Sequence, residues 1–319
     1  MLEIRRYKKS DEEKINRFVL EESANGTFLQ TPQFLNYHKD KFEDASFIVH
    51  KSETVLAFFP GNKTSDNTFV SHQGSTFGGP VLAKKFYKCA RLHELVKTAD
   101  TYFKANYKKV LLKITPQLFT KEPTALLEYL FESEGYTRIR ELSAFVPLNK
   151  GILENCEQDC RRIFKKSENF QTVYRNLETE KELETFYTFL EISKAKYHTK
   201  PVHTLEELLD LKKRIPDNIL FKGLFFNDLF LAGFMLFQFT KTKVMHAQYI
   251  AVDPDFKSFQ ATTCLYIKAM EEAKNQNFNH FSFGISTEEQ GTFLNENLFK
   301  FKESFGAKGT LNVSFEKEF

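Results

Sequence analysis

The residues best placed to do chemistry lie in one stretch of the chain, Phe281–Gly306. An apolar run, Phe281–Ile285, predicts a buried strand, and the polar loop Ser286–Gly291 follows it. Apolar residues then recur at three- and four-residue steps, which predicts one face of a helix that ends at Gly306. Lys302 lies near that end, where a solvated cation compensates the helix dipole. In a cleft from which water is partly excluded, the same ammonium would stabilise negative charge on a reacting oxygen. The expected helix face consists of Phe293, Leu294, Leu298, Phe301 and Phe305.

Two further features are candidates for proton exchange or ligand binding. His246 lies in an apolar strand, Val244–Val252, and an imidazole accepts a proton from an amine near neutral pH. The alternative is a core histidine that bonds to the backbone. Ser286 and Glu288 follow the strand 281–285, at the end where open α/β sheets place ligands. An ordinary polar turn is the alternative for this loop.

A basic helix and a polar loop in the second half of the chain are candidates for substrate binding. Basic residues at positions 161, 162, 165 and 166 form a stripe on a predicted helix, which is either solvated or binds phosphate groups. The loop around residue 200 is either solvated or covers a cleft. The strand of His246 also holds a tyrosine, which lines a channel or packs in the core. The candidate substrate-contacting residues are Arg161, Arg162, His198, Lys200, His203, Tyr249, Ser286 and Glu288.

Length and charge limit the class of protein. A chain of 319 residues favours two domains, and 41% hydrophobic residues are enough for two cores. The 45 basic and 42 acidic residues leave a net charge of only +3. This balance argues against a dedicated nucleic-acid-binding protein, although it is compatible with a local basic patch.

The cysteines indicate a reducing compartment rather than a metal site. Cys156 and Cys160 are closely spaced but no second pair matches them, so we expect no metal. Cys89 and Cys264 fall on apolar helix faces, where we expect them to be buried. This usage is typical of the cytoplasm. No apolar run approaches the roughly 20 residues of a membrane helix, and we recognise no signal-peptide core at the N-terminus.

The order of predicted elements is the same in both halves of the chain. In each half, the pattern of apolar residues predicts antiparallel strands, a helix, a strand and a second helix, which a glycine and a final strand follow. Several residues of the first half recur 171 positions later, which indicates a duplicated α/β unit of about 150 residues. We therefore predict two domains, residues 1–150 and 151–319, each with a mixed, mostly antiparallel sheet flanked by helices. The recurring residues are Leu127, Glu132, Ser133 and Gly135.

Each half resembles the GNAT fold of N-acyltransferases, and the pair is similar to the FemABX family and its FemAB-like relatives. In the second half the resemblance rests on the segments FFNDLFLAGFMLFQF, HAQYIAVDPDF, FSFGIST, NENLFKFKESFGA and KPVHTLEEL. In the first half it rests on FLQTPQFLNYH and SHQGSTFGGPV. The resemblance covers nearly the whole chain and implies two tandem GNAT-like domains.

The resemblance also implies where an activated acyl donor binds. In GNAT enzymes the strand that matches Val244–Val252 splays from its neighbour, and the gap admits an acyl thioester such as acyl-CoA. The next helix N-terminus holds the pyrophosphate, but the matching loop of this chain has no glycine. The FemABX family also lacks this loop and takes an aminoacyl group from aminoacyl-tRNA. Both donors are therefore candidates, and the implied donor-binding residues are Ile250, Ala251, Val252, Lys257, Gln260 and Ala261.

Lys302 is the second departure from the GNAT pattern. The GNAT helix carries a tyrosine that protonates the departing thiolate, whereas this chain has Phe301 and Lys302 ahead of Gly306. FemABX enzymes resemble it in placing a lysine there, which implies that Lys302 stabilises negative charge at the reacting carbonyl. Phe131 stands at the equivalent position of the first half, so we expect the N-terminal domain to bind the acceptor without catalysis. The candidate catalytic residues are Lys302 and, as general base, His246.

Together these features predict a bacterial-type, cytoplasmic N-acyltransferase of cell-envelope biosynthesis. It would move an acyl or aminoacyl group from an activated donor to an amine. The acceptor would be an amino sugar, a cell-wall precursor, a nucleotide-linked sugar or a peptide. One alternative is an aminoacyl-tRNA-dependent enzyme of the FemABX type, which the small net charge disfavours. A second alternative is a degenerate GNAT pair that binds a ligand without chemistry.

Overall fold

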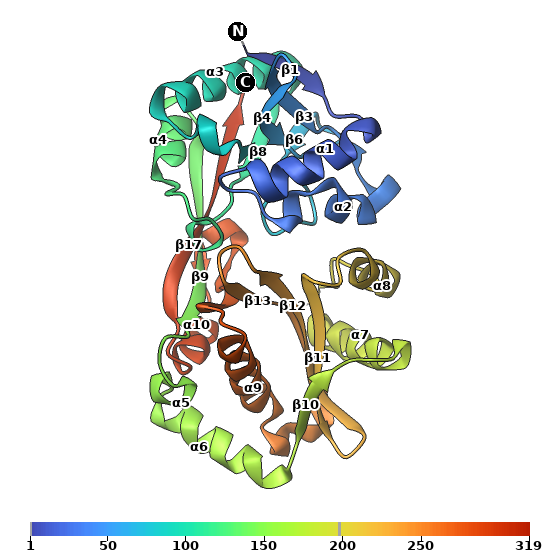
Figure 1. Ribbon diagram of the computed structural model, residues 1–319. Helices are drawn as coiled ribbons and strands as arrows, with labels where there is room; N and C mark the ends of the chain where they lie inside the picture. Colours follow the sequence, from blue (N-terminus) through green and yellow to red (C-terminus); the bar gives the residue numbers. More distant parts are fainter. Residues whose placement is uncertain (1, 197–198) are drawn as a thin grey trace. The chain divides into compact units, whose positions relative to one another are not determined.

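The structure is a computed structural model that describes residues 2–196 and 199–319, without the side chains of residues 38–40 and 257. The chain forms two compact units (Figure 1). The N-terminal unit comprises Met1–Glu141, Glu289–Gly291 and Leu311–Phe319. The C-terminal unit comprises Leu142–Glu288 and Thr292–Thr310. Helices flank mixed sheets in both units, so the predicted α/β class is confirmed.

Two groups of strands and the helix α3 form the core of the N-terminal unit. One sheet has the order β1-β3-β4-β7. The other strands follow the order β17-β8-β6-β5-β2, in which β6 and β8 are parallel. Apolar residues at helical spacing bury one face of α3. The strands are β1 (Glu3–Arg6), β2 (Glu43–Asp44), β3 (Phe47–Lys51), β4 (Thr54–Phe59), β5 (Asn62–Lys63), β6 (Thr68–Val70), β7 (Val81–Leu82), β8 (Lys109–Lys113) and β17 (Lys308–Glu318). The helices are α1 (Glu12–Arg17), α2 (Pro32–Leu35), the 3-10 helix η5 (Lys84–Phe86), α3 (Cys89–Asn106) and α4 (Ala125–Ser133).

A mixed sheet with the order β10-β11-β12-β13-β14-β9 forms the C-terminal unit. Long Phe-rich strands such as β12 are buried over most of their length, because α9 covers one face of the sheet and α7 contacts β12 and β13. The strands are β9 (Thr137–Pro147), β10 (Val173–Asn176), β11 (Ile219–Phe226), β12 (Leu229–Phe239), β13 (Val244–Val252), β14 (His280–Ile285), β15 (Thr287–Glu288) and β16 (Phe293–Leu294). The helices are α5 (Ile152–Asn155), α6 (Gln158–Ser167), α7 (Glu180–Ala195), α8 (Leu205–Arg214), the 3-10 helix η8 (Pro254–Phe259), α9 (Ala261–Asn275) and α10 (Glu296–Glu303).

The two units share one local plan. In the first, α3 connects the parallel strands β6 and β8, and in the second, α9 connects the parallel strands β13 and β14. A short helix then ends near a glycine with positive φ, Gly135 (83°) or Gly306 (81°), before a long strand. A side chain strains this left-handed conformation, which explains the recurrence of glycine.

The compact units divide the chain differently from the predicted boundary at residue 150. Strands β9 and β17 each contribute residues to both units. The last residues of β17, Ser314–Glu318, pair with Lys109–Lys113 of β8. A strand is stabilised by the strands to which it hydrogen-bonds, so the end of the chain belongs to the N-terminal unit.

Two sequence expectations about buried residues have different outcomes. Cys264 is buried, as predicted. The expectation for Cys89 is wrong, because Cys89 is the first residue of α3 and is exposed. The buried face of that helix begins one turn later, at Leu92.

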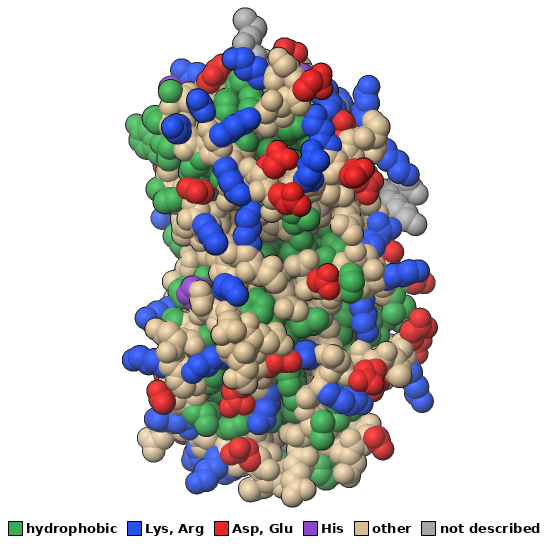
Figure 2. Space-filling view, in the orientation of Figure 1, with side chains coloured by type: hydrophobic (Ala, Val, Ile, Leu, Met, Phe, Trp, Pro, Cys, Tyr) green, Lys and Arg blue, Asp and Glu red, His purple; other side chains and the backbone are tan. Residues whose placement is uncertain are grey.

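The surface carries charges of both signs. Figure 2 shows basic and acidic side chains interspersed on one face, in line with the net charge of +3. Among the helices of residues 2–196 and 199–319, none is long and apolar enough to cross a membrane. Over the same residues, we find no group of three or more His, Cys, Asp or Glu side chains that could hold a metal ion.

Candidate active site

The site begins where two parallel strands separate. β13 and β14 pair at only three positions, from Val244↔His280 to His246↔Ser282. Beyond the last pair, β13 continues to Val252. Each strand also has a register irregularity just past this pair, at Gln248 and Phe283, against its other neighbour. Bulges of this kind bend a strand and re-aim its side chains, so the two strand edges diverge here.

Lys302 lies at the carboxyl end of β14. Its ammonium donates hydrogen bonds to the carbonyl oxygens of Gly284 (2.9 Å) and Ile285 (2.6 Å) and to Ser286 Oγ (2.7 Å). These three acceptors occupy all three N–H donors of a lysine. The side chain is only 3% exposed. The interpretation of Lys302 as a solvated, dipole-compensating lysine is therefore wrong.

The helix that carries Lys302 is shorter than predicted. Phe293 and Leu294 form β16 rather than the start of a helix, and they pair with Glu288 and Thr287 of β15. Asn295 caps α10 by accepting a hydrogen bond from the Leu298 amide. Residues 293, 294 and 298 are exposed, whereas Phe305 is fully buried. The predicted apolar face is thus wrong at its N-terminal end, because a hairpin replaces the first helical turn.

Burial changes the electrostatics of Lys302. It lowers the pKa of Lys302 from its usual value to about 8. The ammonium is therefore still mostly protonated at neutral pH. Among the described residues, no carboxylate forms an ion pair with it, and its partners are two carbonyl oxygens and one hydroxyl. A buried cation of this kind gains strongly from a nearby negative charge.

His246 lies beside Gly284, whose carbonyl oxygen accepts a hydrogen bond from Lys302. A Cβ built on Gly284 would come within 3.5 Å of His246 Cε1, so the imidazole packs directly against this glycine. His246 Nδ1 is 3.0 Å from Ser282 Oγ. Burial, and secondarily the charge of Lys302, lower the pKa of His246 to about 4. His246 is therefore neutral at neutral pH.

A polar chain extends from His246 along β13. The Gln248 side chain interacts with both His246 and Tyr249, and Gln248 is the residue at which the register of β13 is irregular. The Tyr249 hydroxyl lies 2.7 Å from His203 Nδ1. Tyr187 donates a hydrogen bond to the His203 carbonyl oxygen (3.2 Å), which fixes the segment before α8. The predicted residues Lys302, His246, Ser286, Tyr249 and His203 are thus linked through the end of β14 and the outer half of β13.

Aromatic side chains pack against one another at the segment implied to hold a donor pyrophosphate. The Phe259 ring lies 4.5 Å from Phe170 and 5.1 Å from Phe226, measured between ring centroids. Gln260 takes a left-handed conformation (φ 55°) as the N-cap of α9 and makes no side-chain cap. Ala261 begins the helix. Ile250, Ala251 and Val252 pair with β12 on one side and lie beyond the last β13–β14 pair on the other. The side chain of Lys257 lies outside the described residues.

The remaining predicted residues lie apart from this cluster or brace it. Glu288 accepts a hydrogen bond from Asn295 Nδ2 (2.8 Å) and so supports the N-cap of α10. Arg161 and Arg162 are exposed on α6, where Arg162 pairs with Asp159 (3.1 Å). Lys200 is exposed, and His198 lies outside the described residues.

Three residues of the site were missed by the sequence reasoning. They are Ser282, Gly284 and Gln248, all next to predicted residues. The signal for two of them is visible in the sequence, since a serine and a glycine interrupt a Phe-rich strand. Isolated glycine in a strand often marks a bulge or a close backbone approach. Gln248 gives no such signal, because alternation alone does not reveal a bulge.

Comparison with known proteins identifies a family model that matches part of the chain and solved structures with a similar fold. Residues 155–293 match the model of the acetyltransferase (GNAT) domain. FemX is similar over 99% of this chain and 97% of its own, with 12% identity and a TM-score of 0.71. A tandem GNAT protein from the clavulanic acid biosynthesis pathway is similar over 100% and 98%, with 9% identity and a TM-score of 0.58. The chain has a FemAB-like tandem GNAT fold.

The GNAT match includes the parts of the site that lie on β13, α9 and β14, and it stops before α10 and Lys302. L-PGS from Bacillus licheniformis has the same fold, over 96% of this chain and 91% of its own, with 14% identity and a TM-score of 0.62. No curated protein sequence matches the chain. The fold resemblance drawn from the sequence motifs is confirmed, and the part of the chain that matches the GNAT domain model lies mostly in the C-terminal unit.

Proposed function

We propose that the C-terminal unit transfers an acyl or aminoacyl group from an activated donor to an amine. The observation that carries the proposal is the buried ammonium of Lys302 beside two diverging strand edges. Keeping a buried charge without a carboxylate partner is costly. An oxyanion that forms in the reaction would receive that charge at close range, in a site from which water is largely excluded.

The proposed reaction is a direct displacement. The donor carbonyl lies between the edges of β13 and β14, and the amine nitrogen attacks its carbon. A C–N bond forms, and the carbonyl oxygen becomes an oxyanion. Lys302 moves one N–H donor from Ser286 to that oxyanion. Collapse breaks the C–S bond of a thioester or the C–O bond of an ester, and the nitrogen releases a proton.

The proton would pass to the departing thiolate or alkoxide through His246. The neutral imidazole, with a pKa of about 4, has a nitrogen able to accept a proton but is a weak base. It can therefore hand the proton on to the leaving group, which is a stronger base. Tyr249 and His203, at the far end of the polar chain, are proposed to contact the acceptor. Arg161 and Arg162 are proposed to bind phosphates of a nucleotide-linked acceptor or tRNA.

A specific observation favours an aminoacyl ester, as in aminoacyl-tRNA, over acyl-CoA as the donor. The Phe259 ring packs against Phe170 and Phe226 at the start of α9. We infer that this packing leaves less room for a pyrophosphate close to the helix N-terminus than a glycine loop would. The fold likeness to FemX agrees with this choice. The N-terminal unit is proposed to lack catalysis, because its equivalent of Lys302 is Phe131, which is buried in the core.

A donor-binding experiment tests the proposal. We would measure the thermal unfolding of the purified chain with acetyl-CoA, longer acyl-CoAs, free CoA and aminoacyl-tRNA, and follow transfer to amino sugars and peptides by mass spectrometry. A donor at about one hundred times its Kd stabilises a protein by about 2.7 kcal/mol. Stabilisation and transfer with aminoacyl-tRNA are expected. Transfer from an acyl-CoA would reverse the donor assignment, and absence of transfer from every donor would contradict the proposed function.

A further inference from the structure

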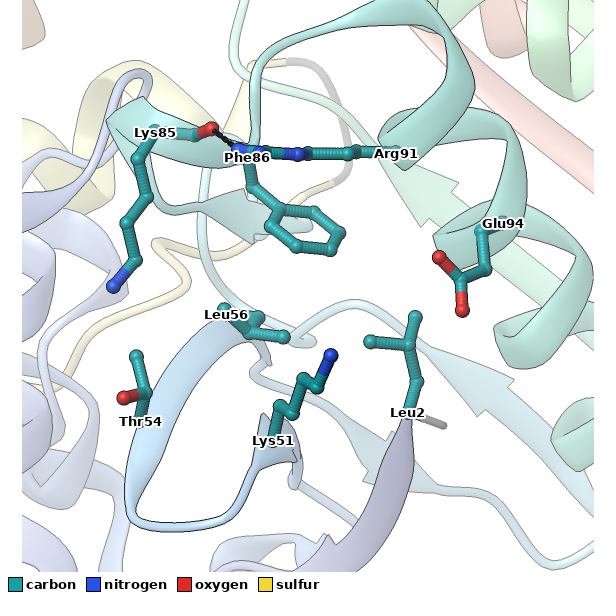
Figure 3. A pocket seen from close by; sticks show the side chains of 8 residues that line it. All are labelled: Leu2, Lys51, Thr54, Leu56, Lys85, Phe86, Arg91 and Glu94. Carbon is teal, nitrogen blue, oxygen red and sulfur yellow. Dashed lines mark hydrogen bonds between the residues drawn. The ribbon is translucent and has the colours of Figure 1, made fainter.

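The N-terminal unit contains a pocket that the proposed reaction does not use. Its volume is about 370 Å³, and it opens beside the β3–β4 hairpin, η5 and the first turns of α3 (Figure 3). From its lining we propose that this pocket binds a small organic anion with an apolar body and one anionic group. The lining residues are Leu2, Lys51, Thr54, Leu56, Lys85, Phe86, Arg91 and Glu94.

The apolar part of the pocket is built from the core of the unit. Leu56 and Phe86 are 3% and 8% exposed, and Leu2 packs against the same core. These side chains are held by the surrounding core, so the apolar surface they present is already formed. When an apolar group of a ligand covers this surface, both are removed from contact with water, and the core of the unit does not have to rearrange.

A backbone irregularity shapes this surface. Between β3 and β4, Val49 pairs with Ala57 and His50 pairs with Val55, so Leu56 is the extra residue of a bulge. A bulge bends the strand and re-aims the side chain that it carries. Leu56 is the bulged residue and also lines the pocket. The pocket thus rests on a specific feature of the backbone, not only on the choice of surface side chains.

Cationic groups surround the apolar surface. The Arg91 guanidinium donates a hydrogen bond to the Lys85 carbonyl oxygen (2.5 Å) and lies 5.8 Å from the centroid of the Phe86 ring, so its position is fixed before any ligand arrives. In Figure 3 the Lys85 side chain descends towards Thr54, and the Lys51 ammonium rises beside Leu56. Within the part of the chain that the structure describes, none of the three cations forms an ion pair.

The lining also limits the ligand. Three cations against one carboxylate, Glu94, favour an anion, whereas the carboxylate disfavours a second anionic group on the ligand. A cavity of about 150 Å³ holds benzene, so this larger pocket has room for one ring with a charged substituent. A guanidinium binds both carboxylates and phosphates with two parallel hydrogen bonds. The shared chemistry is therefore a ring or branched apolar body that carries one carboxylate or phosphate monoester.

Calorimetric titration with three probes of one shape tests this proposal. The probes are phenylacetate, phenyl phosphate and the neutral phenylacetamide, each titrated into the full chain. We expect phenylacetate to bind with a Kd below about 1 mM and the neutral amide to bind at least about tenfold more weakly. Tighter binding of phenyl phosphate than of phenylacetate would identify a phosphate ester as the natural source of the charge.

Variants locate the binding. The double variant Lys51→Gln/Arg91→Gln should weaken phenylacetate binding at least about tenfold. The matched control, Lys97→Gln/Lys104→Gln, removes the same charge from exposed positions of α3 outside the pocket and should leave binding unchanged. Equal weakening by both variants, equal affinity for charged and neutral probes, or no binding at about 10 mM probe would overturn the proposal. The result does not depend on the proposed acyl transfer, because Lys302→Met should leave phenylacetate binding intact.

Discussion

At the residue scale, Lys302 combines a structural role with the proposed catalytic one. Replacing Lys302 with Met keeps the length and the apolar stem of the side chain but removes the donors to Gly284, Ile285 and Ser286. Buried acceptors left without a partner cost about 1–3 kcal/mol. We expect Lys302→Met to lower the free energy of unfolding by about that amount and the rate of transfer by about 100-fold or more.

Denaturant unfolding and single-turnover transfer measure these two effects separately. The matched control is Lys300→Met, on the same helix, where the side chain is exposed and forms only a surface pair with Glu296. Surface pairs contribute little, so the control should keep both stability and rate. Transfer by Lys302→Met at the wild-type rate would refute the catalytic role of Lys302.

The lowered pKa of His246, the other titratable residue of the site, predicts that the stability of the chain depends on pH. The folded-state pKa of His246 is about 4, below the value of about 6.5 expected in the unfolded chain. Between these values the unfolded state binds more protons, so this group's contribution is fully present above pH ~6.5 and is lost as pH falls towards 4. A folded-state pKa of about 4 in place of 6.5 corresponds to at most about 3–4 kcal/mol of stability.

The variant His246→Gln isolates this contribution from that of the other acids and bases. The difference in unfolding free energy between wild type and variant should shrink from pH 7 to pH 4. The control is His50→Gln, which removes a partly exposed histidine at the β3 hairpin. A difference that stays constant over this range would show that His246 keeps its usual pKa in the folded chain.

At the element scale, two glycines with positive φ fix the ends of β14 and α10. Gly284 has φ 75°, and an added Cβ would meet only His246 Cε1 at an ordinary contact distance of 3.5 Å. Gly306 has φ 81°, and an added Cβ would lie 2.6 Å from the Asn155 carbonyl oxygen. We expect Gly284→Ala to cost about 1–2 kcal/mol from backbone strain alone. Gly306→Ala should cost more, because the backbone of residue 155 must also move.

Chemical denaturation of the two variants, side by side, compares these costs. Gly309→Ala serves as a control, because its φ lies outside the left-handed region and the nearest atom, Leu142 Cδ1, belongs to a side chain. Its effect should be the smallest of the three. A larger loss for Gly284→Ala than for Gly306→Ala would contradict the assigned role of steric overlap.

Sequence periodicity recovered the elements of the C-terminal unit better than the position of its key side chain. The strand Val244–Val252 has the predicted bounds, because a continuous apolar run determines it. The helix near Lys302 was predicted too long, since the same apolar spacing hides the β15–β16 hairpin. The burial of Lys302 depends on carbonyl groups of a neighbouring strand, which no local pattern reveals.

At the scale of the whole molecule, the repeat of the chain was predictable but the division into units was not. The recurrence of residues 171 positions apart corresponds to two copies of helix, positive-φ glycine and strand. The predicted boundary followed the order of the sequence. In the structure, the end of the chain joins the N-terminal unit through the pairing of β17 with β8. Such pairing between distant segments leaves no signal in either segment alone.

This pairing predicts what removal of the last strand would do. Deleting residues 311–319 removes Val313 and Phe315, both buried in the core of the N-terminal unit, and exposes one edge of β8. The lost apolar burial alone is worth about 3–6 kcal/mol, a large part of the stability of a typical domain.

Hydrogen exchange read by mass spectrometry should show faster exchange of the β8 amides and unchanged protection in β12 and β13. The exposed-site variant Leu311→Ala should change neither. Because the core of the C-terminal unit contains no residue after 310, equal loss of protection in both units would show that they unfold as one.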